Sequence, residues 1–219
     1  MREITPEKSL QQLLEETTST RQCEGCFGGA LTDCEECLKR EHRADRKDRF
    51  RELMSNAFDT DEVNHMEYDL DELGFFDAPA SIKYHGCETG GLFEHSYCVT
   101  NTLLRLTEDL GLKWKMERSP YLIGMFHDLC KCESYTWSNT AAKWEYNKEM
   151  TLPGHGEKSA MMAMRLTYLS EEEMMCIRWH MGAFDDNKNW EYFTRAVREN
   201  PNVLYVHMAD MIASQVHGV

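Results

Sequence analysis

Six residues that can bind metal ions are spread along this chain between positions 95 and 210. They are four histidines and two aspartates: His95, His127, Asp128, His155, His180 and Asp210. Divalent transition metals take imidazoles and carboxylates as ligands, and two ions about 3.5–4 Å apart can share a bridging aspartate and a bridging water. The sequence therefore predicts a metal centre that is assembled from distant parts of the chain.

The spacing of these residues predicts one ligand segment per helix. Two of them, His127 and Asp128, are adjacent, and the other separations are 32, 27, 25 and 30 residues. Each lies in an apolar, helix-like stretch of sequence. Helices are stiff enough to hold imidazoles and carboxylates around a pair of ions, so we expect the six side chains to converge.

The candidates divide into two sets that share Asp128. The first ion would take His95, His127, Asp128 and Asp210, and the second would take Asp128, His155 and His180. A site with a single ion is the alternative, and in that case His155 and His180 place the substrate.

The strings around these residues resemble the HD-domain superfamily of metal-dependent phosphohydrolases. They are Gly-Gly-Leu-Phe-Glu-His-Ser at 90–96, His-Asp-Leu-Cys-Lys at 127–131, Gly-His-Gly-Glu-Lys-Ser at 154–159 and His-Met-Gly at 180–182. The resemblance covers residues 81–217. It implies an α-helical bundle that binds one or two divalent ions (Mn²⁺, Fe²⁺, Co²⁺, Ni²⁺ or Zn²⁺) and hydrolyses phosphomonoesters or phosphodiesters of nucleotides.

The chain departs from one branch of that superfamily. The HD-GYP phosphodiesterases have paired histidines where this chain has Trp179 and His180, and the Gly-Tyr-Pro string is absent. Cyclic di-GMP is therefore not the expected substrate, and a nucleotide or a short oligonucleotide is.

Several residues near the ligands are candidates for catalysis or substrate binding. Asp128 and Lys131 are the predicted catalytic residues, because Lys131 lies one helical turn beyond Asp128 and can reach a substrate phosphate. Arg178 and Lys158 are candidates for the same contact. His85 is a candidate for lining the pocket, and His207, three residues before Asp210, for orienting a ligand.

Two other functions use the same ligands. Some HD-fold proteins are mixed-valence di-iron oxygenases that cleave C–C or C–P bonds with O₂. A third hypothesis is a non-catalytic nucleotide-binding adaptor.

The predicted fold class is all-α: an HD-type helical bundle (residues 81–219) with a small β-hairpin insertion within 132–150. Alternating aromatic residues around Asn139 predict that hairpin. An N-terminal part (1–57) is predicted to hold a helix at 5–17, a cysteine-rich arm and a charged helix near 37–57. Residues 58–80 are predicted to be an acidic linker.

The cysteine-rich arm contains two Cys-x-x-Cys pairs separated by seven residues: Cys23, Cys26, Cys34 and Cys37. Four thiolates with this pairing are typical of a tetrahedral, structural zinc site. Reduced thiols, a redox switch and an iron–sulfur cluster are the alternatives. The other five cysteines, among them Cys130, are interpreted as small apolar residues.

Composition limits the partners of this 219-residue chain. Its 24 basic and 38 acidic residues give a formal charge of -14, which disfavours a long nucleic acid and still permits a small phosphorylated substrate. We find no signal peptide and no transmembrane stretch, and nine cysteines suit a reducing compartment. We therefore expect a cytoplasmic protein.

Overall fold

The computed structural model of this chain describes residues 35–219. Internal contacts divide the chain into two units, Met1–His42 and Arg43–Val219. Helix α2 (Glu35–Met54) contributes its first turns to the first unit and the remainder to the second. The predicted helix at 5–17, together with Cys23, Cys26 and Cys34, lies outside the described residues, as does the side chain of Cys37. The zinc hypothesis thus stays a prediction.

The segment predicted as an acidic linker is instead part of the folded unit. Helix α3 (Thr60–Glu72) starts at a capping box formed by Asp59 and Glu62, and it buries Val63, Met66 and Leu70. Their spacing places all three on one face of the helix. The prediction that 58–80 is a linker is wrong. Acidic residues separate the three buried apolar residues along the sequence, so the apolar face of the helix was not recognised.

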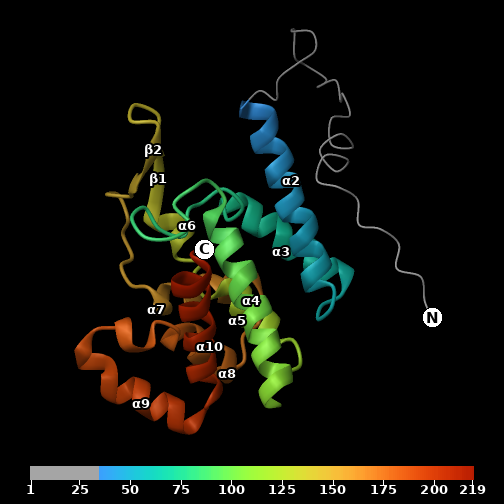
Figure 1. Cartoon of the computed structure of the whole chain (residues 1–219), viewed down its shortest axis with the longest axis vertical. Helices are drawn as coiled ribbons and strands as arrows, with labels where there is room; N and C mark the ends of the chain where they lie inside the picture. The colour runs from blue at the N-terminus through green and yellow to red at the C-terminus, as the bar shows by residue number, and fades with distance from the viewer. Residues whose placement is uncertain (1–34) are drawn as a thin grey trace, which may run out of the picture. The chain divides into compact units, whose positions relative to one another are not determined.

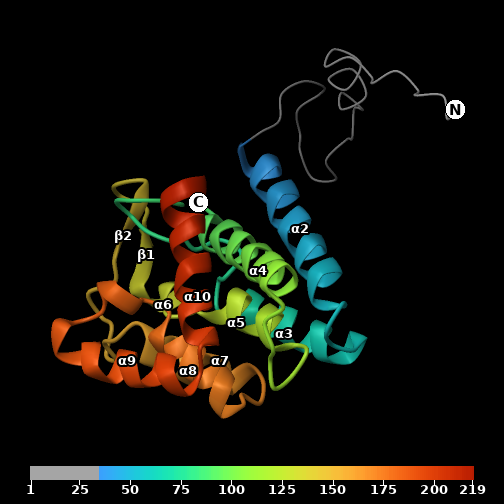
Figure 2. The same cartoon turned by 60° about the horizontal axis from the view of Figure 1, so that its bottom comes forward.

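The helices at the centre of the second unit pack against one another in pairs. Helix α4 (Gly91–Leu110) packs against α5 (Ser119–Phe126), and α10 (Asn202–Met211) packs against α4, as Figures 1 and 2 show. Helices α7 (Gly156–Leu166) and α8 (Glu171–Trp179) pack against each other, and α8 also contacts α5 and α10. These contacts bring together segments that are distant in sequence.

The remaining helical elements connect and cover this bundle. They are α6 (Lys131–Ser134), the 3₁₀ turns η1 (Gly182–Phe184) and η2 (Asn187–Asn189), α9 (Trp190–Glu199) and the π-helical η3 (Ile212–His217). A capping box formed by Ser170 and Glu173 starts α8.

The only sheet within residues 35–219 is the predicted hairpin. Strand β1 (Tyr135–Ser138) pairs antiparallel with β2 (Lys143–Tyr146), so that Tyr135 faces Tyr146 and Trp137 faces Trp144. Side chains alternate along a strand, which puts all four rings on one face of the hairpin. The prediction of a mostly α-helical domain with a small hairpin is confirmed.

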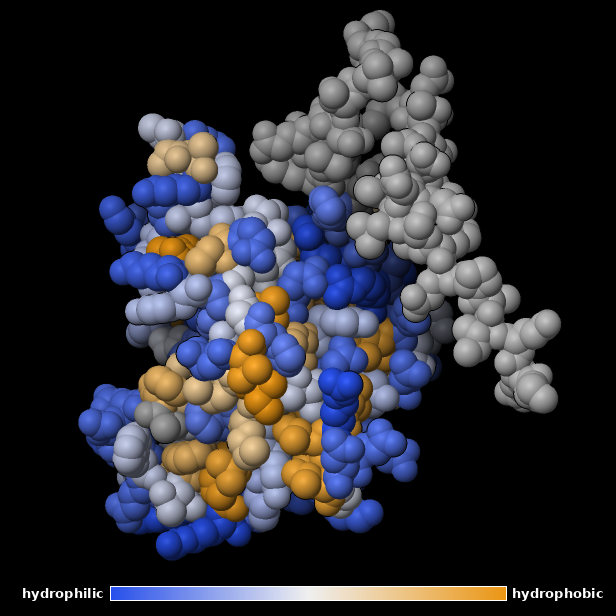
Figure 3. Space-filling model, viewed as in Figure 1, coloured by the Kyte–Doolittle hydropathy of each residue, from blue (hydrophilic) through white to orange (hydrophobic). Residues whose placement is uncertain are grey.

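A continuous apolar core fixes the helices of the second unit. Four fully buried phenylalanines, Phe50, Phe75, Phe76 and Phe93, join α2, the end of α3 and α4 through edge-on and tilted ring contacts with centroids 5.5–6.2 Å apart. On the face shown in Figure 3, patches of hydrophobic residues lie among hydrophilic residues. Within residues 35–219, each helix is too short or too polar to cross a lipid bilayer.

Candidate metal centre

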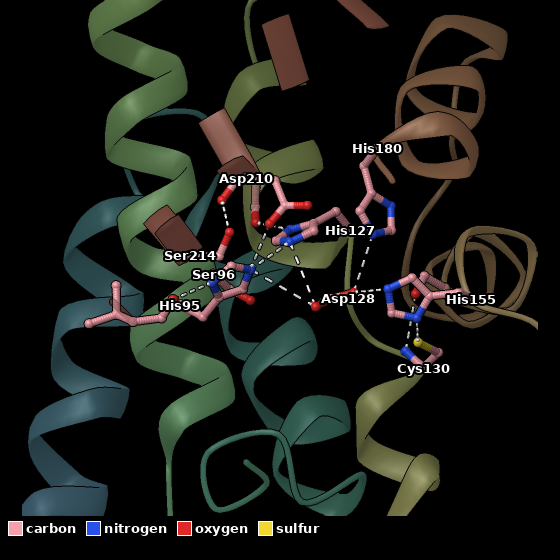
Figure 4. A network of polar contacts seen from close by, with 12 residues as sticks. His95, Ser96, His127, Asp128, Cys130, His155, His180, Asp210 and Ser214 are labelled. Atoms are coloured by element: carbon pink, nitrogen blue, oxygen red, sulfur yellow. Dashed lines mark hydrogen bonds and ion pairs between the residues drawn. The ribbon is translucent and has the colours of Figure 1, made fainter. Parts of the chain in front are cut away.

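The six predicted ligand residues lie together in the second unit (Figure 4). His95 projects from α4, and Asp210 lies on α10. His127 directly follows α5 with Asp128 next to it, His155 directly precedes α7, and His180 directly follows α8. Three imidazoles and Asp128 are buried, whereas the side chains of His155 and Asp210 are 29% and 14% exposed. The centre is therefore enclosed, with an open side at His155.

Two of the imidazoles are oriented by the helices that carry them. Nδ1 of His127 lies 2.8 Å from the carbonyl oxygen of Gly124, and Nδ1 of His180 lies 2.7 Å from that of Ile177. Both contacts join a residue to the carbonyl three positions earlier, at a helix end where carbonyls lack helical partners. A carbonyl oxygen only accepts, so each Nδ1 carries the proton and each Nε2 presents its lone pair to the centre.

His95 is oriented in the same way by a more distant carbonyl. Its Nδ1 lies 2.9 Å from the backbone oxygen of Val219. Its Nε2 then faces Nε2 of His127 at 3.2 Å and Oδ1 of Asp210 at 3.3 Å. Two nitrogen lone pairs at this distance repel each other unless a proton or a cation lies between them.

Asp128 occupies the middle of the cluster. Its Oδ1 lies 2.9 Å from Nε2 of His155 and 3.3 Å from Nε2 of His180. Its Oδ2 lies 3.9 Å from Nε2 of His95 and 4.0 Å from Nε2 of His127. Each oxygen of this carboxylate thus faces a different pair of imidazoles, which is the arrangement that a bridging ligand requires.

Oδ1 of Asp128 and Nε2 of His180 are buried 3.3 Å from each other. Both are acceptors, and Nε2 of His180 has no hydrogen-bond partner in the described part of the chain. An unsatisfied buried acceptor is costly, and a divalent cation between the two atoms would remove that cost. The residues present therefore fit a bound cation.

Three overlapping groups of side chains can each hold an ion. Within each group the ligand atoms lie within 4.8 Å of one another: His95, His127 and Asp128; His127, His180 and Asp210; Asp128, Cys130 and His155. The first and third share Asp128, as the sequence predicts. The sequence did not predict that His180 lies beside His127 and Asp210. It also did not predict that Cys130 belongs to one of the ligand groups.

The electrostatics of the cluster favour the protonation states that metal ligands need. Burial raises the pKa of Asp128, but the imidazole of His155 and the ammonium of Lys131 outweigh burial and hold that pKa well below its ordinary value. Burial raises the pKa of Asp210, but the contact with His95 and the other nearby imidazoles outweigh burial, and the pKa falls to about 2. Burial lowers the pKa of His127 to about 3, which keeps that ring neutral.

His155 holds its proton more firmly than His127 does. Burial lowers its pKa, but Asp128 and Cys130 raise it more, and the pKa reaches about 10. A cation that binds Nε2 of His155 therefore displaces a proton held there by Asp128.

Lys131 lies close enough to Asp128 to lower the pKa of its carboxylate. It follows Asp128 by one turn, its Nζ lies 5.8 Å from the centre of the Tyr135 ring, and within residues 35–219 it forms no ion pair. Burial lowers its pKa, but the neighbouring carboxylate of Asp128 raises it more, so the ammonium remains charged. Lys131 is thus available to an anionic ligand.

The other two cations proposed for substrate binding are already paired. Arg178 contacts Glu157 at 2.6 Å and Asp185 at 2.7 Å, and Nζ of Lys158 is buried against Glu133 at 2.8 Å. The expectation that Arg178 and Lys158 contact the substrate is therefore not carried further. Their ion pairs hold α7, α6 and the end of α8 in place.

Two further histidines surround the ligands. The ring centre of His85 lies 4.9 Å from that of His95, and its buried Nδ1 has no partner in the described residues. His207 donates from Nδ1 to the backbone oxygen of His180 at 2.8 Å. His85 therefore lines the cluster as expected, and His207 holds the segment that carries His180.

Sequence reasoning missed Cys130. A buried thiol is usually a small apolar residue, and nothing in the spacing of the chain marks this one. Its position between Asp128 and Lys131 indicates a role at the metal centre only once the contact with His155 is known. Comparisons with protein-family models, curated proteins and solved structures found no match to this chain.

Proposed function

We propose that this chain is a metal-dependent phosphohydrolase that cleaves a phosphoester of a nucleotide or short oligonucleotide. The observation that supports it most is the buried convergence of four imidazoles on Asp128 and Asp210, with three Nε2 lone pairs directed inward by fixed Nδ1–H donors. We also propose, from the order and local strings of these ligands, that the fold is that of the HD-domain superfamily.

The residues divide into those that hold cations and those that hold the substrate. His95, His127 and Asp210 would hold one divalent ion, His155 and His180 a second, and Asp128 would join both. Bound divalent ions supply Lewis acidity: they neutralise phosphoryl oxygens and lower the pKa of water. The chain's own contribution is to keep His127 neutral, the carboxylates of Asp128 and Asp210 ionised and bulk water away.

Lys131 would bind the substrate phosphate. Its charged ammonium lies beside Asp128 and carries no other partner within residues 35–219. A positive charge fixed next to the reacting phosphate stabilises the negative charge that develops on the departing oxygen. Its removal should therefore reduce turnover more than it reduces metal binding.

The hairpin supports a nucleotide as substrate. Its aromatic face begins at Tyr135, beside Lys131, and continues to Trp137 and Tyr146, which are 42% and 54% exposed. Aromatic rings bind nucleobases by stacking, at about 1–3 kcal/mol per base. A phosphate at the metal centre would leave the attached base within reach of this face.

The test is an Asp128→Ala variant measured for bound metal and for turnover. Both proteins would be loaded with Mn²⁺, Co²⁺, Ni²⁺ or Mg²⁺ and assayed on bis(p-nitrophenyl) phosphate, nucleoside phosphates and short oligonucleotides. Loss of the shared carboxylate should lower metal affinity and turnover by about 100-fold or more, since even outer-sphere partners cost about 10–100-fold.

Asp109→Ala is the matched control, because Asp109 is an exposed aspartate near the end of α4. It should retain metal and activity. Equal metal content and equal turnover in Asp128→Ala and the wild type would refute the proposal. Oxygen uptake by the iron-loaded protein, without hydrolysis, would favour the di-iron oxygenase.

A further inference from the structure

Cys130 is the hydrogen-bond partner of the fourth imidazole. Its Sγ lies 3.0 Å from Nδ1 of His155. Figure 4 shows this contact as a dashed line. In the three other rings Nδ1 meets a backbone carbonyl. Among these four ligand histidines, His155 alone is therefore oriented by a side chain.

The backbone around Cys130 holds the sulfur in place without help from the sulfur itself. The N–H of Cys130 donates to Oγ of Ser159 at 3.1 Å, and its carbonyl accepts from Oγ of Ser134 at 2.7 Å. Ser159 lies on α7, one turn after His155. The same two segments thus carry both members of the Cys130–His155 contact, and loss of the thiol leaves these anchors intact.

A thiol can act on an imidazole in two ways, whereas a carbonyl can act in one. If sulfur accepts the Nδ1–H, a cation can displace the Nε2 proton that faces Oδ1 of Asp128, 2.9 Å away, and the neutral ring then offers its Nε2 lone pair to the ion. If S–H donates to Nδ1, the ring proton sits on Nε2 and is bonded to Asp128, so that nitrogen cannot bind a cation. The direction of this one hydrogen bond decides whether His155 is a ligand.

We propose that Cys130 is a positioning residue whose sulfur accepts the Nδ1–H of His155 and keeps Nε2 as the metal-binding nitrogen. This inference rests on the metal centre of the proposed function. The position of Oδ1 of Asp128, 2.9 Å from Nε2 of His155, supports it independently, because one cation can then bind both atoms.

The experiment compares Cys130→Ala and Cys130→Ser with the wild type by calorimetric titration of the metal-free proteins with Mn²⁺ and Co²⁺. Cys130→Ala should weaken the ion held by His155 by about 10–100-fold and leave the other ion unchanged, the range found for partners of metal-bound histidines. Cys130→Ser should restore most of that affinity, because a hydroxyl oxygen accepts the same N–H. Cys132→Ala is the matched control, since this neighbouring thiol belongs to none of the three ligand groups, and it should behave as wild type.

Three results would overturn the inference. One is wild-type affinity for both ions in Cys130→Ala, and another is a Cys130→Ser variant that binds no better than Cys130→Ala. The third is a thiolate-to-cobalt charge-transfer band that disappears in Cys130→Ala, which would make Cys130 a direct ligand. Because titration needs no turnover, a wild-type protein that binds two ions but hydrolyses no phosphoester would refute the phosphohydrolase proposal alone.

Discussion

Gly156, the residue after His155, marks the closest approach of α7 to α8. A Cβ placed on Gly156 would lie 2.1 Å from the backbone oxygen of Arg178, whereas ordinary contacts begin at 3.4 Å. The two helices would have to separate by the difference, 3.4 − 2.1 = 1.3 Å. The obstacle is backbone, so no side-chain rotation relieves it.

Gly156→Ala should therefore affect both stability and metal binding. Overpacking of this kind costs about 1–3 kcal/mol, and for a domain of this size each kcal/mol lowers Tm by about 2–4 °C. Metal–ligand distances tolerate only about 0.2 Å, so a shift of the His155 segment that approaches 1.3 Å should remove it from the centre. We expect the ion held by His155 to be lost and the other to remain.

Differential scanning calorimetry and metal titration measure the two effects separately. Gly111→Ala is the control: Gly111 ends α4 with φ +63° and no atom within 4 Å of an added Cβ. It should lose about 1–2 kcal/mol through backbone strain but keep its metal affinity. If Gly156→Ala bound both ions as tightly as the wild type, the packing argument for His155 would be wrong.

Three other predictions concern the metal centre and its surroundings. Removal of metal with a chelator should lower Tm, because ion at 100 times its Kd stabilises the fold by about 2.7 kcal/mol; an unchanged Tm would mean that the cluster binds none. Lys131→Met should reduce kcat by about 100-fold and leave the metal content intact, and equal kcat would exclude Lys131 from the reaction. Trp137→Ala should raise KM for nucleotides by about 5–150-fold, from the loss of about 1–3 kcal/mol of stacking. It should leave KM for bis(p-nitrophenyl) phosphate less affected, and the same substitution at Tyr168, exposed elsewhere at 75%, should change neither.

Much of the helical framework could be predicted from local signals. The Ser170–Glu173 capping box and the Ser119-Pro120 start mark helices that the structure contains, and the alternating aromatics mark the hairpin. These signals depend on neighbouring residues only. Helix α3 was missed because its stripe of three buried residues is set among many acidic ones.

The ligand residues could be chosen from the sequence, but their grouping could not. Residue type and spacing select His180 as a ligand, yet its position beside His127 and Asp210 follows from how α8 crosses α5 and α10. Likewise the sequence does not reveal that Arg178 and Lys158 form ion pairs with neighbouring carboxylates in the fold. Such outcomes depend on tertiary contacts, which spacing along the chain does not encode.

The ring orientation of His127 and His180 is a local property, since each ring bonds to the carbonyl three residues earlier on its own helix. Each imidazole is consequently fixed to its helix, and the ring and the helix move together. Substitutions on the protein surface can accumulate without turning these rings, whereas a small tilt of α8 would swing His180 away from its neighbours. Small displacements of α8 would thus affect the rates at which a cation binds and dissociates.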